Sequence, residues 1–253
     1  MNEPSSLPAW DSCWALFLDV DGTLLEIMAH PDEVRAAPRL RRLLGTAAAW
    51  LGGAVALVSG RSIASLDAVF HPLRLPAAGL HGLERRDAGG RVHYPTGYAE
   101  RIAAARGALL DFVQSAAGLL LEDKGAALAL HYRGAPALEQ ECRRRIELAR
   151  EAAGEDFHVQ HGKMVYELKP SGRDKGTAVS DFMAEAPFRG RRPVFVGDDV
   201  TDEDGFRAVN ALGGISIRVG DSDRSAAQRA AADVAAILDW LNRCPEAGDA
   251  DTE

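Results

Sequence analysis

The stretch ALFLDVDGTL, residues 15–24, joins an uninterrupted apolar run to two carboxylates that lie two residues apart. An apolar run without polar alternation predicts a strand covered on both faces, as in a parallel sheet. Asp19 and Asp21 then lie at the carboxyl end of this strand, where Gly22 lets the chain turn sharply. An isolated Asp-x-Asp-Gly segment is also typical of an ordinary turn, so its meaning depends on the rest of the chain.

Two later segments have the same form, an apolar run that ends in polar residues. They are 54–58 before Ser59, and 193–196 before Gly197 and Asp198. Apolar residues at helical spacing follow the first two runs. This alternation predicts a doubly wound α/β fold with a parallel sheet, which a strand at 215–219 and an Ala-rich helix at about 225–241 complete. Strand ends in such a sheet open on one edge, so Asp19, Ser59 and Asp198 should converge.

The middle of the chain has a different pattern. It reads as helix, two strands, helix, two strands, over 98–113, 119–121, 126–131, 138–152, 157–160 and 164–168. This order predicts a compact α+β unit with an antiparallel sheet, inserted into the core as a cap. The expected domains are a core at 9–83 and 170–244, an α/β cap at 84–169 that determines substrate specificity, and flexible tails at 1–8 and 245–253.

Two groups of acids in this pattern carry chemical meaning. With Asp19 and Asp21, one carboxylate can act as a nucleophile while the other donates and accepts protons. A second group follows a later core strand: Asp198, Asp199, Asp202 and Asp204. The helix dipole stabilises acidic side chains at the start of a helix, and this effect accounts for part of the group. This effect explains Asp198 and Asp199 poorly, and these two residues indicate instead a site of hard oxygen ligands suited to Mg²⁺.

Two basic or hydroxyl segments could hold an anion beside these acids. Ser59-Gly60-Arg61 ends a strand and begins a helix, so its hydroxyl and backbone N–H groups are placed to bind phosphate oxygens. A serine at this position is also an ordinary helix cap. Lys175 begins a later predicted helix and can neutralise both a phosphate and Asp19, although single lysines are usually surface groups.

Four motifs, in this order, resemble those of the haloacid dehalogenase (HAD) superfamily of phosphatases: DVDGTLL at 19–25, SGR at 59–61, KG at 175–176 and GDDVTDED at 197–204. Other segments resemble the trehalose-6-phosphate phosphatases within it: GLHG at 79–82, ExK at 122–124, HYR at 131–133, GKMVYELKP at 162–170 and TDEDGF at 201–206. The resemblance covers the chain from about residue 16 to 219 and implies a Rossmann-like HAD core. The sequence departs from the family pattern at Val20, where an aromatic is common, and at 125–127, where a hydroxyl residue often follows ExK.

The resemblance implies a Mg²⁺-dependent phosphatase that hydrolyses trehalose 6-phosphate through an aspartyl-phosphate intermediate. It implies Asp19 as nucleophile, Asp21 as general acid/base, and Ser59 and Lys175 on the transferring phosphoryl group. Mg²⁺ would be held by Asp19, Asp21 through its carbonyl, and Asp198, with Asp199 and Asp202 in support. The substrate would be bound by Gly60, Arg61, Glu122, Lys124, Arg133, Lys163 and Glu167, with His131 nearby.

Three other functions are compatible with parts of this pattern. A phosphatase for sucrose phosphate or a glycosylglycerate phosphate would share the core but bind a different alcohol. A non-catalytic sugar-phosphate binding module is disfavoured because every catalytic position is filled. A metal-dependent glycosyltransferase with an Asp-x-Asp motif explains neither Ser59 nor Lys175.

Composition limits the partners of the chain. A formal net charge of -8 over 253 residues argues against a nucleic-acid surface, which needs clustered Lys and Arg. Cys13, Cys142 and Cys244 are widely spaced, as expected in a reducing cytoplasm. We expect no membrane segment and no secretion signal. The predicted protein is a cytoplasmic monomer whose partner is a small sugar phosphate.

Overall fold

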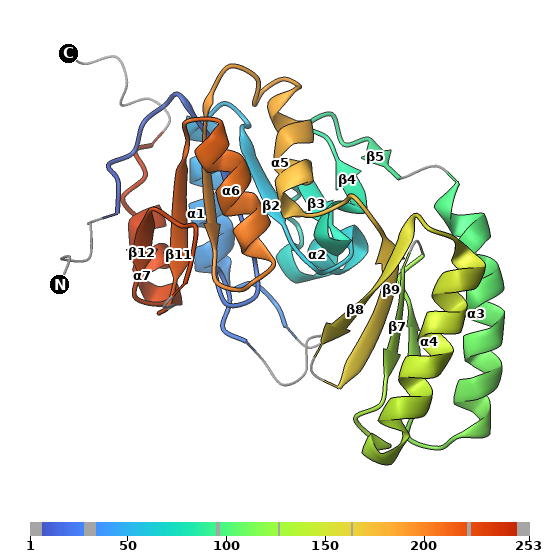
Figure 1. Ribbon diagram of the computed structural model, residues 1–253. Coiled ribbons are helices and arrows are strands. Elements are labelled where there is room, and N and C mark those ends of the chain that lie inside the picture. The colour runs from blue at the N-terminus through green and yellow to red at the C-terminus, as the bar shows by residue number, and fades with distance from the viewer. Residues whose placement is uncertain are drawn as a thin grey trace, which may run out of the picture. The chain divides into compact units, whose positions relative to one another are not determined.

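The computed structural model describes residues 7–27, 34–94, 97–125, 127–162, 164–221 and 224–246. The chain forms two compact units (Figure 1). The first, called the core unit, consists of Met1–His93 and Arg173–Glu253. The second, called the inserted unit, consists of Tyr94–Gly172.

An eight-stranded sheet forms the centre of the core unit, in the order β12-β11-β10-β1-β2-β3-β4-β5. Its strands are β1 (Trp14–Leu18), β2 (Val55–Val58), β3 (Ala77–Gly79), β4 (Glu84–Arg86), β5 (Val92–His93), β10 (Arg192–Gly197), β11 (Ile215–Val219) and β12 (Arg229–Ala231). Neighbours from β12 to β3 pair in parallel, and β4 and β5 add an antiparallel edge. Strands β1 and β2 are buried along their whole length, which confirms the prediction from their apolar runs.

Helices cover both faces of this sheet (Figure 1). On one face α1 (Pro38–Trp50) packs with α7 (Val234–Leu241), and on the other α5 (Lys175–Met183) packs with α6 (Asp202–Ala211). Helix α2 (Ile63–Phe70) follows β2 and contacts β3 and β4, next to the short 3-10 helix η2 (Leu80–Gly82). This is the doubly wound α/β architecture that the alternation of strands and helices predicts.

Helix α6 packs closely on strand β10 because Gly205 has no side chain. A Cβ atom at Gly205 would lie 2.7 Å from ring atoms of Phe195. The Phe195 ring is fully buried and lies edge-on to Phe206, with ring centroids 5.7 Å apart. This close packing brings Asp202, the first residue of α6, to the carboxyl end of β10.

All four tryptophans of the chain belong to the core unit. Trp10 stacks on Trp240 with ring centroids 4.8 Å apart, and its ring also contacts those of Trp14 and Trp50. This cluster joins the start of the described chain to helix α7, so tryptophan fluorescence reports on the core unit alone.

The expected flexible tail over 1–8 needs a correction. Leu7 packs against the hydrophobic core, and the Pro8 carbonyl accepts a hydrogen bond from the Trp240 indole at 2.8 Å. Apolar packing therefore holds the chain from residue 7 onward. Residues 1–6 and 247–253 lie outside the described residues.

The inserted unit contains a four-stranded antiparallel sheet, in the order β6-β7-β9-β8, with two helices on one face (Figure 1). Its elements are α3 (Tyr98–Ser115), β6 (Leu120–Asp123), β7 (Leu128–His131), η3 (Pro136–Leu138), α4 (Glu139–Ala153), β8 (Phe157–Gly162) and β9 (Val165–Pro170). Leu128, Leu130 and Leu168 of the strands pack against Ile102 and Ile146 of the helices. Across the described part of the chain, the helices lack the combined length and apolar character needed to cross a membrane.

Two predicted boundaries differ from the structure. The predicted cap begins at residue 84, but β4 pairs with the core strand β3 and β5 pairs with β4, so the inserted unit begins at Tyr94. The predicted helix at 225–241 begins only at Val234, because Arg229–Ala231 forms β12 beside β11. Asp233 caps this shorter helix by accepting a hydrogen bond from the Ala236 N–H at 2.8 Å.

We expect Phe195→Ala to lower the free energy of unfolding of the core unit by about 3–5 kcal/mol, because it leaves a cavity between β10 and α6. Leu212→Ala is the control, since Leu212 directly follows α6 but is 51% exposed, and its effect should stay within about 0.5 kcal/mol. Urea unfolding followed by tryptophan fluorescence measures both variants. Similar losses in the two would contradict the packing described for Phe195.

Candidate active site

Polar side chains from neighbouring core strands meet at one edge of the sheet. Strand β1 lies between β10 and β2 and pairs in parallel with both, so the residues that follow these strands lie at the same edge. Strand order reverses around β1, and open α/β sheets bind ligands at such reversals. Asp19, Asp198 and Asp202 each place a carboxylate oxygen within 4.8 Å of the others. The predicted convergence of Asp19 and Asp198 is therefore observed.

Lys175 links two buried carboxylates that belong to different elements. Its Nζ donates to Asp19 Oδ1 at 2.8 Å and to Asp202 Oδ1 at 2.6 Å, and all three residues are almost fully buried. The lysine is the first residue of α5, where Asp174 and Thr177 form a reciprocal capping box. The cap fixes the helix start, and with it the point from which Lys175 reaches the sheet edge.

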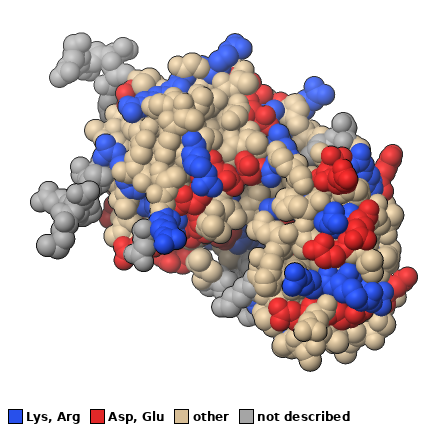
Figure 2. Space-filling view, in the orientation of Figure 1, with Lys and Arg blue, Asp and Glu red and all other residues tan. Residues whose placement is uncertain are grey.

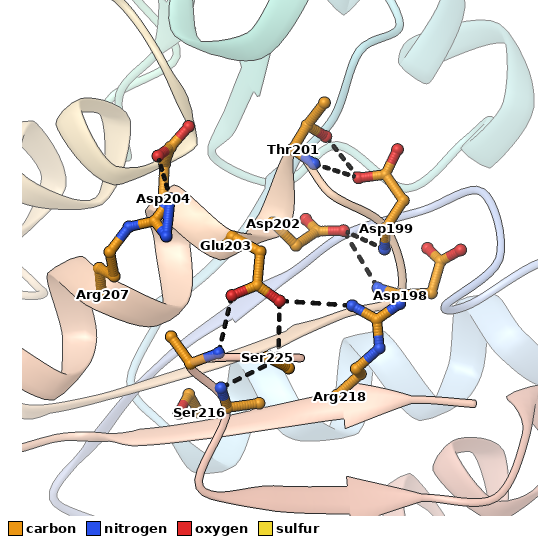
Figure 3. A network of polar contacts seen from close by, with 12 residues as sticks. Asp198, Asp199, Thr201, Asp202, Glu203, Asp204, Arg207, Ser216, Arg218 and Ser225 are labelled. Atoms are coloured by element: carbon orange, nitrogen blue, oxygen red, sulfur yellow. Dashed lines mark hydrogen bonds and ion pairs between the residues drawn. The ribbon is translucent and has the colours of Figure 1, made fainter. Parts of the chain in front are cut away.

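Asp202 organises the backbone that carries Asp198 and Asp199. Its Oδ2 accepts the N–H groups of both residues at 3.0 Å (Figure 3). Gly197 permits this approach, since a Cβ atom there would lie 2.3 Å from the Asp202 carboxyl carbon. Because both Asp202 oxygens already accept hydrogen bonds, the contacts favour a role in shaping the site over direct ligation of a cation.

Asp198 lies against the turn that follows Asp19. Thr23 Oγ1 donates to Asp198 Oδ1 at 3.2 Å. Gly22 has a φ of +85°, and a Cβ atom there would lie 2.1 Å from Asp198 Oδ2, so glycine satisfies both the backbone and the space at this position. The neighbouring Asp199 Oδ1 accepts from the N–H and hydroxyl of Thr201 at 2.7 and 2.6 Å (Figure 3).

The site holds more buried negative charge than its lysine balances. Burial raises the pKa of Asp19 to about 6, and Lys175 opposes this shift only in part. Burial and the charge of Asp19 raise the pKa of Asp202 to about 7, and burial with the neighbouring acids also raises the pKa of Asp198. Burial by itself would lower the pKa of Lys175, but the carboxylates of Asp19 and Asp202 outweigh burial and raise it. One ammonium among three acids leaves a demand for further positive charge.

The oxygen atoms at this edge suit a small, hard cation. The carboxylates of Asp19 and Asp198 lie close together and offer oxygen atoms of the kind that Mg²⁺ prefers as ligands. The raised carboxyl pKa values indicate independently that positive charge is favourable there. The residues present therefore fit a magnesium ion.

Arg61 contacts Asp21, a pairing that the sequence analysis did not foresee. Its Nε and Nη2 donate to the two carboxylate oxygens of Asp21 at 2.7 Å each. The Arg61 N–H also donates to Oγ of the buried Ser59 at 3.2 Å. Ser59, Arg61 and Asp21 thus form one connected group, although 40 residues separate the two charged partners.

The inserted sheet has one face packed on helices and one face without them, here called the open face. Asp123 faces the helices, since its carboxylate pairs with Arg106 of α3 at 2.7 Å. Side chains alternate along a strand, so Glu122 projects to the open face. Ala129 is aligned with both Glu122 and Glu167, which places the two glutamates on the same face.

Two side-chain pairs lie on the open face. Glu122 and His131 are joined by a hydrogen bond at 3.1 Å, and Lys124 forms an ion pair with Glu167 at 2.8 Å. Two further polar residues on this face were not predicted from the sequence. Gln160 is aligned with Glu167, and Lys169 lies two residues after Glu167 on β9. The period-two alternation of β9 was the signal that could have found Lys169.

The other predicted substrate residues have separate positions. Arg133 is exposed just beyond β7. Gly60 lies in the core unit against His81, where a Cβ atom would be 2.8 Å from the imidazole ring. Lys163 lies outside the described residues.

Several known proteins are similar to this chain over most of its length. The family model described as trehalose-phosphatase matches residues 17–235. A "Probable trehalose-phosphate phosphatase" of Sinorhizobium fredii is 51% identical over 209 residues, covering 82% of this chain and 78% of the relative. A "Trehalose-6-phosphate phosphatase" of Escherichia coli is 43% identical over 247 residues, covering 95% and 90%.

Solved structures with these names have a similar fold. A "trehalose-6-phosphate phosphatase related protein" superposes with a TM-score of 0.74 at 27% identity, over 90% of this chain and 95% of that one. The trehalose-6-phosphate phosphatase of Aspergillus fumigatus superposes with a TM-score of 0.64 at 25% identity, over 93% and 97%.

The raised carboxyl pKa values predict a pH-dependent effect of Mg²⁺ on stability. An unfolded aspartate has the ordinary pKa of 3.8, whereas the folded values are about 6 for Asp19 and about 7 for Asp202. Between pH 3.8 and about 7, the folded state therefore holds more protons than the unfolded state. In EDTA, the stability that the cluster contributes falls as the pH rises through this range. Because Mg²⁺ would bring positive charge next to these carboxylates, it would favour their ionised forms and should raise the urea midpoint more above the folded pKa values than below them.

Asp198→Asn is the control for this measurement. It removes one negative charge and one ligand oxygen from the cluster, so the stabilisation by Mg²⁺ should largely disappear. An equal Mg²⁺ effect at both ends of the pH window, or one that survives in Asp198→Asn, would contradict this account of the charge at the site.

Proposed function

The chain belongs to the trehalose-phosphatase family, and from this premise we propose how its residues hydrolyse trehalose 6-phosphate to trehalose and phosphate. The observation that carries the proposal is the position of Asp19. It follows a central strand, lies almost fully buried, contacts Lys175 and lies beside Asp198. A carboxylate held in this way has a fixed direction of attack and a cationic partner.

In the first step, an Asp19 carboxylate oxygen attacks phosphorus. The bond from phosphorus to the sugar oxygen breaks, and Asp21 gives that oxygen a proton, so trehalose leaves as a neutral alcohol. Ser59 and Lys175 contact the transferring phosphoryl group. Lys175 already donates to Asp19, which supports its role in lowering the repulsion between the carboxylate and the phosphate.

In the second step, water attacks the phosphorus of the aspartyl-phosphate. Asp21, which lost its proton in the first step, accepts one from the water as the new bond forms. The bond from phosphorus to Asp19 breaks and regenerates the carboxylate. Asp21 thereby serves both steps from one position, and the enzyme returns to its starting state.

Mg²⁺ is the proposed cofactor. Asp19, the Asp21 carbonyl and Asp198 would hold it, with Asp199 and Asp202 in support. When bound, it supplies positive charge that neutralises phosphate oxygens and developing charge in the transition state. The neighbouring carboxylates of Asp19 and Asp198 and the excess of acidic groups over Lys175 support this assignment.

The open face of the inserted unit is the proposed recognition surface for the sugar. Carboxylates and ammonium groups supply the acceptors and donors that a disaccharide needs. The residues proposed to bind it are Glu122, Lys124, Arg133, Lys163 and Glu167. The two side-chain pairs on this face support the proposal, because they fix polar groups at set spacings before the substrate arrives.

We further propose that the protein is a cytoplasmic monomer. Cys13, Cys142 and Cys244 are free thiols, as a reducing compartment favours. In the view of Figure 2, acidic and basic side chains are interspersed over the surface, a distribution typical of a solvated face.

A substrate panel tests the proposed function. Phosphate release should be fastest with trehalose 6-phosphate and should depend on Mg²⁺, compared with sucrose 6-phosphate, glucose 6-phosphate and para-nitrophenyl phosphate. Asp19→Asn is the control for contaminating phosphatase and should show no turnover. Preference for another sugar phosphate would overturn the assignment of trehalose 6-phosphate while retaining Asp19, and full activity of Asp19→Asn would overturn the mechanism.

Two adjacent residues on opposite faces of β6 test the recognition surface. Glu122→Gln removes a charged acceptor from the open face, and we expect it to raise KM for trehalose 6-phosphate about 10- to 100-fold, as loss of a charged hydrogen bond does. Its activity on para-nitrophenyl phosphate, which has no sugar, should change little. Asp123→Asn is the matched control on the helical face and should leave both activities unchanged. Equal effects of the two substitutions would count against the open face as the sugar site.

A further inference from the structure

The ion pair between Arg61 and Asp21 has the geometry of a strong, directional contact. Two nitrogens of one guanidinium donate to the two oxygens of one carboxylate, each at 2.7 Å. Such paired bonds fix the plane of the carboxylate as well as its distance, which a single-point lysine contact does not. The arginine side chain is 10% exposed and the aspartate 38%.

The backbone of Arg61 is anchored on both sides. Its N–H donates to Ser59 Oγ at 3.2 Å, and its carbonyl accepts the Leu80 N–H at 3.0 Å. Gly79 packs directly on that carbonyl, where a Cβ atom would lie 2.8 Å from the oxygen. Helix α2 begins two residues later, with Ser62 as its cap. The guanidinium therefore extends from a fixed segment of the core.

The backbone of Asp21 forms a bridge with Leu25, but its side chain is less constrained than that of Arg61. Asp21 lies in a turn whose next residue, Gly22, has a φ of +85°, and its side chain is the more exposed partner. Its carboxylate can rotate about χ2, a broad torsion with little intrinsic preference. The direction in which the Asp21 oxygens point is therefore set by Arg61.

We propose that Arg61 is the positioning residue for proton transfer by Asp21, in place of the substrate-binding role that the SGR motif implies. This inference rests on the proposed function, in which Asp21 protonates the leaving alcohol and later deprotonates water. The two hydrogen bonds from Arg61 occupy two of the roughly four lone-pair sites of the carboxylate, so a site on each oxygen remains for the transferred proton. Proton transfer requires donor and acceptor within hydrogen-bond reach, so a freely rotating carboxylate would be slow in both steps.

The test uses two substrates without a sugar that differ in the basicity of the alcohol released. Phenyl phosphate releases a more basic phenolate than para-nitrophenyl phosphate, so it depends more on a proton donor. The quantity compared is kcat/KM, which includes the steps through release of the phenol. The variants are Asp21→Asn, Arg61→Ala, Arg61→Lys and the double variant of Asp21→Asn with Arg61→Ala.

Arg61→Ala should slow phenyl phosphate about 10- to 100-fold and para-nitrophenyl phosphate several-fold less, as expected when part of a general acid's contribution is lost. Asp21→Asn should have the same selectivity. Adding Arg61→Ala to Asp21→Asn should cause little further loss, because the group that the arginine positions is no longer a proton donor. Arg61→Lys keeps the charge but not the paired geometry, and should not restore the rate on phenyl phosphate.

Equal slowing of both substrates by Arg61→Ala, or a full additional loss in the double variant, would overturn the inference and return Arg61 to binding the phosphate. If Asp21→Asn itself lacks the leaving-group selectivity, the proton-transfer role of Asp21 in the proposed function fails, and the inference fails with it. If Asp21→Asn shows the leaving-group selectivity but Arg61→Ala does not, the role of Asp21 in proton transfer stands and only the inference about Arg61 is rejected.

Arg86→Ala is the control for a structural effect. Arg86 is 4% exposed and pairs with Asp67 at 2.7 and 2.8 Å, so its loss removes a comparable buried arginine without touching Asp21. It should lower stability in the tryptophan-monitored urea assay while leaving the ratio of the two substrate rates unchanged. A changed ratio in Arg86→Ala would mean that general loosening of the core causes the selectivity, which would also overturn the inference.

Discussion

The contact on which the site depends is the buried ammonium of Lys175 between the carboxylates of Asp19 and Asp202. It joins the end of β1 to the first residues of α5 and α6, elements far apart in the sequence. Leaving one charge of such a group without its partner typically costs about 3–5 kcal/mol, so each of the three positions constrains the other two. The same contact leaves the site short of positive charge, because Asp198 adds a third acid beside a single ammonium. The proposed binding of Mg²⁺ at this edge of the sheet would supply the missing positive charge.

Close backbone approaches maintain this arrangement. Gly22 and Gly197 leave room for the side chains of Asp198 and Asp202, and Gly205 lets α6 pack on the ring of Phe195. Asp202 then uses its second oxygen to hold the N–H groups of Asp198 and Asp199. The acidic segment after β10 therefore combines Asp198, a proposed ligand of Mg²⁺, with Asp202, which fixes the backbone around it. The network continues through Glu203, which accepts hydrogen bonds from Ser225 and Arg218 and so ties the loop before β12 to α6 (Figure 3).

Features of the fold that depend on local pattern could be predicted from the sequence. Apolar runs such as 15–18 predicted the buried parallel strands. The parallel order of these strands predicted that Asp19 and Asp198 lie close together. Features set by tertiary contacts could not be predicted. Strands β4 and β5 are short and largely polar, so the sequence shows no periodic pattern that predicts their pairing in the core sheet. The Ala-rich segment before α7 has the composition of a helix, although part of it pairs with β11 as a strand. The pairing of Arg61 with Asp21 and the two-sided use of Asp202 depend on side-chain directions that no sequence spacing encodes.

In the proposed mechanism, the constrained carboxylate of Asp19 becomes the covalent phosphoryl carrier. The most direct measurement is an acid-quenched single turnover of the Asp21→Asn variant with para-nitrophenyl phosphate and Mg²⁺, followed by mass spectrometry of the peptides. This substrate depends little on a proton donor, so the variant should slow attack by water more than formation of the intermediate, which then accumulates. We expect a phosphoryl group on Asp19. A phosphoryl group on any other residue, or release of phosphate without a labelled peptide at any quench time, would contradict it.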